Sequence, residues 1–174
     1  MADTKISALS AASTLDGTEI VPVVQGGTTK RSTVALINAQ SGTSVRGNLG
    51  YAEITADQTG IGTSITDLTG LAVTVTVNSG ERIKVTGYVP SFWNPSATMQ
   101  LEFLIRESST TLNNSRVPVT SGGNNNGYGM VQWIGTPSAG SHTYKLSLKT
   151  STGTVNVAGG ATNPAFILVE GIGT

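Results

Sequence analysis

The stretch GLAVTVTVNSGERIKVTGYV, residues 70–89, alternates apolar and polar residues on both sides of a short turn. The apolar positions are Leu71, Val73, Val75 and Val77 before the turn, and Ile83, Val85 and Val89 after it. A period of two is typical of strands with one buried face, and Asn78-Ser79-Gly80 is a turn sequence. We therefore predict two antiparallel strands that are joined as a β-hairpin.

The same period continues through most of the chain after residue 50. Further strands are predicted in YAEIT (51–55), TMQLEFLIRE (98–107), SRVPV (115–119), YGMVQWI (128–134), HTYKLSLK (142–149), TVNVAG (154–159) and AFILVEGI (165–172). Charged residues make up 11% of the chain, and 22 of its 174 residues are glycine. Short strands separated by polar, Gly-rich turns predict an all-β fold, an antiparallel β-sandwich of jelly-roll type.

The last predicted strand differs from the others because Ala165 to Val169 is apolar at every position. Such a strand needs cover on both faces. We expect the sandwich core to cover one face and a neighbouring subunit to cover the other. The predicted subunit interface is Phe166, Ile167, Leu168 and Val169.

The first 48 residues form a separate predicted unit, an N-terminal docking segment with a linker, and residues 49–174 form the sandwich. In EIVPVV (19–24), Pro22 cannot donate to a ladder, which indicates an edge strand. Asp16-Gly17 and Gln25-Gly26-Gly27 predict turns, and Ser32 or Thr33 is placed to cap a short helix over residues 34–37. The unit is too small for a core of its own, so we expect it to dock on another surface. The predicted docking residues are Ile20, Val21, Pro22, Val23, Val24, Gln25, Gly26 and Gly27.

The sequence predicts neither a catalytic site nor a metal or cofactor site. The chain has no cysteine. Its one histidine, His142, occupies the same alternate positions as the apolar residues of its predicted strand, and no nucleophile motif lies beside it. Acidic residues are scattered without the order of a calcium loop. A pair of carboxylates facing each other across a cleft, as glycosidases use, depends on the fold and stays open at this level.

Net charge and the aromatic residues limit the binding partners. The formal charge is zero, which disfavours nucleic acid, and no apolar run is long enough to predict a membrane helix or a signal peptide. Trp93, Tyr128 and Trp133 are candidates for stacking on sugar rings, although most aromatic residues of a sandwich this size are expected in the core or at a subunit contact.

Two segments of the chain resemble structural proteins of tailed bacteriophages. The first is KISALSAASTLDGTEIVPVVQGGTTKRSTVALI (5–37), which is similar to a K-I-S-x-L…V-P-V-V-Q-G-G segment near the start of tail-fibre or head-decoration chains. The second is the DQTGI (57–61) and TDLTGL (66–71) opening of a phage-associated sandwich domain that ends in VEDIG, where this chain has Gly171 in place of the aspartate.

The resemblance implies a non-enzymatic virion protein, made in the host cytoplasm and commonly a homotrimer. A capsid decoration (cement) protein that stabilises the head is the first expectation, with the major capsid protein or other virion proteins as partners. A short tail or head fibre, or an adaptor that binds a host glycan, is the alternative.

Overall fold

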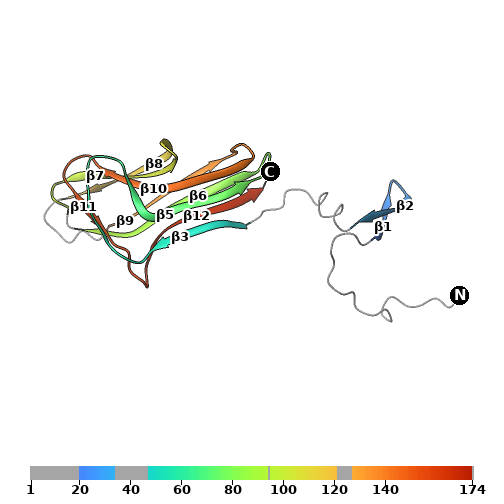
Figure 1. The fold of residues 1–174 in the computed structure, drawn as a ribbon, viewed down its shortest axis with the longest axis horizontal. Coiled ribbons are helices and arrows are strands. Elements are labelled where there is room, and N and C mark those ends of the chain that lie inside the picture. The colour runs from blue at the N-terminus through green and yellow to red at the C-terminus, as the bar shows by residue number, and fades with distance from the viewer. Residues whose placement is uncertain (1–19, 34–46, 94, 121–126, 174) are drawn as a thin grey trace. The chain divides into compact units, whose positions relative to one another are not determined.

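The computed structural model describes residues 20–33, 47–93, 95–120 and 127–173, and the chain divides into two compact units, residues 1–44 and 45–174 (Figure 1). The strands of the larger unit are β3 (Gly47–Ile54), β4 (Gln58–Ile61), β5 (Thr66–Val77), β6 (Arg82–Trp93), β7 (Met99–Glu107), β8 (Thr110–Val119), β9 (Gly127–Gly135), β10 (Gly140–Thr150), β11 (Val155–Val157) and β12 (Ala165–Gly173). Every strand predicted in this unit is present. β4 is additional, and its Gln-Thr-Gly sequence carries no period-two pattern.

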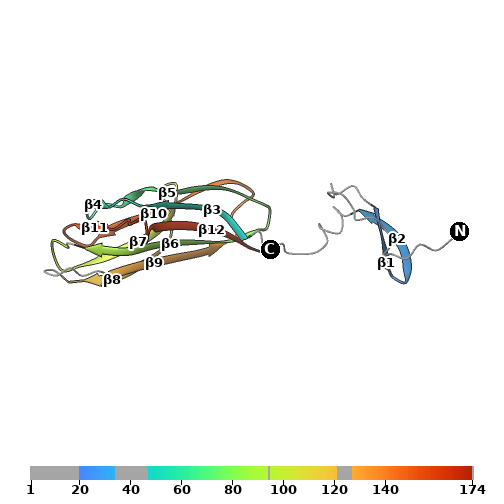
Figure 2. The same ribbon diagram turned by 90° about the horizontal axis from the view of Figure 1, so that it is seen from below.

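The larger unit is an antiparallel β-sandwich. One sheet has the order β5-β10-β7-β8, and the other has β3-β12-β6, with β9 paired to the free side of β6 and the short β11 and β4 continuing one end (Figure 2). The facing orders β3-β12-β6-β9 and β5-β10-β7-β8 are those of a jelly roll. The predicted fold class is thereby confirmed.

The hairpin predicted in residues 70–89 is wrong. β5 pairs with β10, whereas β6 pairs with β12, β9 and β11, so the two strands lie in different sheets. The connection is a tight corner at which the buried Glu81 accepts a hydrogen bond from the Asn78 N–H at 2.8 Å. Both strands turn their valines toward the same core from opposite sides, and a hairpin would produce the same alternation.

The core lies between the sheets and is filled mainly by aliphatic side chains, together with Phe92, Phe103 and Tyr144. Phe92 of β6 and Phe103 of β7 lie with ring centroids 6.3 Å apart. The inward positions of β9 opposite these rings are Gly127 and Gly129, and a Cβ on Gly129 would lie 2.0 Å from the Phe103 ring. These glycines therefore make room for the rings.

β12 alternates between the core and the outer face of its sheet. Ile167 and Val169 are completely buried in the core of their own chain, while Phe166 and Leu168 are half-buried on the outer face. The outer position Phe166 is partly covered within the chain by the rings of Tyr51 on β3 and Tyr88 on β6. The structure thus removes Ile167 and Val169 from the predicted subunit interface and leaves Phe166 and Leu168 as candidates.

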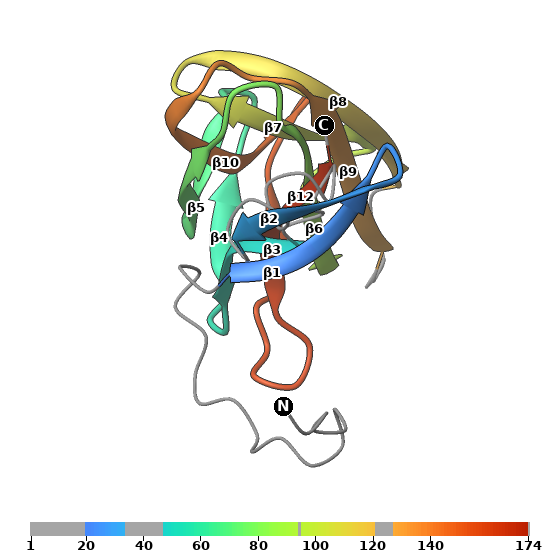
Figure 3. The same cartoon turned by 90° about the vertical axis from the view of Figure 1, so that its right-hand side faces the viewer.

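The smaller unit contains a two-stranded hairpin, β1 (Ile20–Gln25) and β2 (Thr28–Thr33), shown in blue in Figure 3. The predicted strand and the turn at Gly26-Gly27 are confirmed. Ser32 and Thr33 end β2, and both the short helix predicted after them and the turn at Asp16-Gly17 lie outside the described residues. Asn48, the predicted domain boundary, lies inside β3. Within the described ranges there is no helix that could span a membrane.

Candidate functional site: two unlike sheet faces

The outer face of the β3-β12-β6-β9 sheet carries a row of aromatic and apolar side chains. Phe166 of β12 lies directly opposite Tyr88 of β6, and Tyr88 lies opposite Met130 of β9. The Phe166 ring centroid is 5.4 Å from that of Tyr88 and 5.8 Å from that of Tyr51 on β3, with tilted planes. We define the aromatic face by Tyr51, Tyr88, Tyr128, Met130, Phe166 and Leu168.

Much of the aromatic face is accessible in the isolated chain. The side chains of Tyr128, Met130 and Tyr51 are 69%, 52% and 47% exposed, and the neighbouring Ile134 is 51% exposed. Most of the large exposed apolar side chains of the sandwich therefore lie on this one surface. Contiguous exposed apolar patches on soluble domains commonly mark interaction sites.

Two charged groups on the same sheet face form an ion pair within the chain, and a third accepts a hydrogen bond from the face. Lys84 forms an ion pair with Glu170 at 2.7 Å between Nζ and Oε2. The Tyr51 hydroxyl donates to the Glu53 carboxylate at 2.5 Å, and this hydrogen bond raises the pKa of Tyr51 above its ordinary value. The face accordingly presents rings, a thioether, one ion pair and the hydrogen-bonded Glu53 carboxylate.

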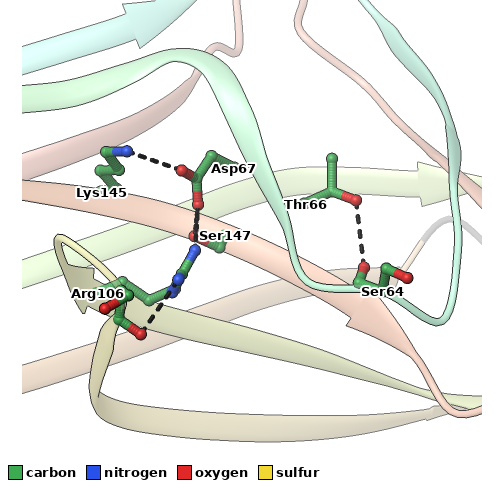
Figure 4. A network of polar contacts seen from close by, with 7 residues as sticks. Ser64, Thr66, Asp67, Arg106, Lys145 and Ser147 are labelled. Carbon is green, nitrogen blue, oxygen red and sulfur yellow. Dashed lines mark hydrogen bonds and ion pairs between the residues drawn. The ribbon is translucent and has the colours of Figure 1, made fainter.

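The outer face of the β5-β10-β7-β8 sheet is polar, and one network on it centres on Asp67 (Figure 4). The Asp67 carboxylate accepts from Ser147 Oγ at 2.6 Å, Arg106 Nη1 at 2.7 Å and Lys145 Nζ at 2.9 Å. Partial burial pushes the pKa of Asp67 upward, but the hydrogen bonds from Ser147 and Lys145 and the charges of Lys145 and Arg106 outweigh it, so the pKa lies below its usual value. This carboxylate is a fixed anion.

A second polar cluster on that face surrounds Glu102. Its carboxylate accepts from Asn114 Nδ2 at 2.6 Å and lies 3.4 Å from both Arg116 Nε and Lys149 Nζ. A cavity of about 270 Å³ lies beside it, lined by Thr63, Gln100, Glu102, Arg116, Lys149, Thr150 and Ser151. Among the described residues Glu102 is the one carboxylate that lines this cavity, so the described lining lacks the facing pair of acids that glycosidase chemistry uses.

His142 is held by acceptors at both ring nitrogens. Nδ1 lies 2.6 Å from the Glu107 carboxylate, and Nε2 lies 2.8 Å from the Ser138 carbonyl. Both nitrogens must donate in this arrangement, which favours the imidazolium form. The hydrogen bond to Glu107 raises the pKa of His142, burial opposes it, and the Ser138 carbonyl adds to the increase. A histidine occupied in this way is a structural ion-pair partner, and the sequence pattern alone does not reveal Glu107.

The three residues predicted for sugar stacking are divided between two environments. Trp133 points toward the interior and lies 5.9 Å from the buried Tyr144. Phe92 pairs with Gly127, and both positions face the core. Alternation therefore puts Trp93 and Tyr128, the next residues, on the outer face at the same end of the sheet. Across the parts of the chain that the structure describes, no group of three or more acidic or histidine side chains is close enough to hold a metal ion.

The predicted docking residues 20–27 form β1 and the turn of the hairpin. Ile20 and Val24 are 60% and 75% exposed, and Pro22 is also exposed. These three alternate positions share one side of β1. The hairpin thus presents an apolar row that none of the described residues covers.

Comparisons with known proteins give similarities of architecture. No protein-family model matches the chain, and no curated protein matches it. Among solved structures, a carbohydrate-binding module from Cellvibrio mixtus lichenase 5A, in complex with cellotriose, is 17% identical with a TM-score of 0.36, covering 71% of this chain and 97% of that one. The Eiger TNF of S. frugiperda is 12% identical with a TM-score of 0.38, covering 73% and 94%. At these values the likeness is confined to the β-sandwich, and what those proteins bind is a property of those proteins.

Proposed function

We propose that the protein is a non-enzymatic structural protein of a tailed-bacteriophage particle, and that its sandwich associates into a homotrimer. The assignment to a phage particle and the number three rest on the sequence resemblance. Self-association is supported by the structure's two unlike sheet faces, and this contrast is the observation that carries the proposal.

The residue composition of the aromatic face is more typical of a protein interface than of a surface that contacts water. Tyr, Phe and Met are enriched in interface cores, and charged residues are depleted there. Because Lys84 and Glu170 neutralise each other, a second copy can cover this pair without burying an unpaired charge there. The chain's net charge of zero also removes long-range repulsion between copies. The opposite sheet, with its Asp67 and Glu102 clusters, suits contact with water.

Substitution of Met130 by glutamate tests the association. Met130 is 52% exposed in the isolated chain, so Met130→Glu should change the stability of the monomer by less than about 0.5 kcal/mol. In a trimer the same carboxylate would be buried without a partner, which costs several kcal/mol. We expect sedimentation velocity at micromolar concentration to show a trimer for the natural sequence and a monomer with unchanged circular dichroism for the variant.

Ala72→Glu is the matched control, because Ala72 is an exposed strand position on the opposite sheet face. It introduces the same charge and should leave the trimer intact. A monodisperse monomer of the natural sequence would contradict the proposal, as would a Met130→Glu variant that still forms trimers.

The position on the particle separates a capsid decoration protein from a fibre or adaptor. A decoration protein that binds only the assembled shell stabilises that shell by mass action. Phage particles made without the protein should then lose DNA from their heads at lower temperature or under osmotic shock, while adsorbing to cells normally. Intact heads that fail to adsorb would favour the fibre or adaptor role.

Glycan binding is a second candidate because Tyr128 is the most exposed ring of the aromatic face, and Trp93 lies on the same face at the same end. Flat rings at the edge of a sheet can stack on sugar rings through their apolar faces. Titration with host surface polysaccharide, followed by tryptophan fluorescence, should show binding that Tyr128→Ala removes. Binding that persists in the variant would count against this site.

A further inference from the structure

Among the described residues no strand pairs with either outer edge of the N-terminal hairpin, and its turn determines which backbone groups each outer edge presents. Gln25 pairs with Thr28 across the two-residue turn Gly26-Gly27, whose φ values are 61° and 74°. Positive φ at both residues is the type I′ geometry, in which the Thr28 N–H donates to the Gln25 carbonyl. Gln25 and Thr28 therefore form a hydrogen-bonded pair.

Hydrogen-bonded and non-hydrogen-bonded pairs alternate along an antiparallel ladder. Counted from the turn, Val24–Thr29 and Pro22–Arg31 are non-hydrogen-bonded pairs. The backbone N–H and C=O groups of such pairs point away from the partner strand, toward the free edge of their own strand. Pro22 fits into β1 for this reason, since its missing N–H is not one that the hairpin needs.

The two outer edges are consequently unequal. The edge of β1 lacks its central donor at Pro22, whereas the edge of β2 presents the N–H and C=O groups of both Thr29 and Arg31. Among the described residues no third strand pairs with the hairpin. An isolated two-stranded hairpin is marginally stable at best in water, and a further strand on β2 would stabilise it.

The charges of β2 indicate the chemistry of the partner. Lys30 and Arg31 are both exposed, and residues 20–33 contain no Asp or Glu. We propose that β2 docks by adding to an exposed strand edge of another protein, with carboxylates beside that edge pairing with Lys30 and Arg31. This inference rests on the proposed docking role of the N-terminal unit, and it assigns the docking to β2 rather than to the apolar row on β1.

Substitution of Thr29 by proline tests the edge. Thr29→Pro removes an outward N–H in the way that Pro22 does on β1, and it keeps the ladder bonds of Thr28 and Lys30. Thr29→Val is the matched control, because it keeps the N–H and the β-branched shape. The probe is a short capped peptide of alternating valine and glutamate, added to the full-length ¹⁵N-labelled protein.

We expect the peptide to slow amide exchange at Thr29 and Arg31 and to leave Ile20 and Val24 unchanged. Thr29→Pro should lower the peptide affinity by about tenfold, and Thr29→Val should not, because loss of one donor leaves a partner carbonyl unsatisfied. Protection along β1, or equal affinity of the proline variant, would overturn the proposal. If a valine–lysine peptide bound as tightly as the valine–glutamate peptide, the proposed pairing of partner carboxylates with Lys30 and Arg31 would be wrong.

Co-sedimentation with particles made without the protein distinguishes this inference from the proposed function. If the natural protein binds the peptide at β2 but does not bind the particles, the virion role is wrong and the edge assignment stands. If Thr29→Pro binds the particles as well as the natural protein does, the edge assignment is wrong and the virion role stands. Loss of particle binding in Val24→Glu alone would place docking on the apolar row and also overturn the edge assignment.

Discussion

His142 bridges the Glu107 carboxylate and the Ser138 carbonyl, and this position links the stability of the sandwich to pH. Because the pKa of His142 is raised in the folded state, its contribution is fully present below the unfolded value near 6.5 and is lost as pH rises through the folded pKa. Urea unfolding at one protein concentration should therefore show that the stability advantage of the natural sequence over His142→Gln is larger at pH 5.5 than at pH 8.0. A constant difference across this range would contradict the ion pair.

Polar pairings of this kind are the part of the molecule that the sequence predicts least. Glu107 and His142 lie 35 positions apart, and Asp67 and Lys145 lie 78 apart. Their partnership depends on strand register, including a shift between Lys145 and Ser147 in the pairing of β10 with β5. Composition correctly indicates a chain with few charges, but it does not say which charges meet.

Each residue of β12 belongs to either the core or the outer sheet face, and aspartate substitutions should separate the two roles. Ile167 is completely buried, so Ile167→Asp should cost several kcal/mol and prevent folding, since total stabilities are commonly about 5–15 kcal/mol. Leu168 is half-buried on the aromatic face, so Leu168→Asp should fold and remain monomeric. Circular dichroism and sedimentation distinguish these outcomes. A folded trimer from either variant would show that the role of that residue has been misassigned.

The alternation of apolar and polar residues predicts where the strands lie, but it predicts less well which strands pair with each other. The period-two pattern locates β5 and β6, yet it is identical for a hairpin and for a corner between two sheets, and the structure has the corner. The glycines of β9 are a similar case. Gly129 lies inside a predicted strand, and the sequence does not show that the space it leaves is filled by the Phe103 ring from the other sheet. Neighbour relations across a sandwich depend on contacts that local sequence does not contain.

At the scale of the whole molecule, the sandwich and the hairpin unit have different requirements for stability. The core cluster of buried apolar residues lies entirely between Ile61 and Val169, within the larger unit. The described residues of the hairpin take no part in this cluster, and its Ile20 and Val24 are exposed. The N-terminal unit can thus be lost without removing any buried apolar side chain of the sandwich.

A chain limited to residues 45–174 should therefore keep the Tm and the association state of the full protein, while losing its binding to particles made without the protein. Calorimetry, sedimentation and co-sedimentation measure these three properties on the same preparation, and the full chain carrying Thr29→Val serves as the control that retains docking. Particle binding by the shortened chain at undiminished affinity would place the docking surface on the sandwich. A shortened chain that fails to fold would show that the hairpin unit stabilises the sandwich, and that the two units are not independent.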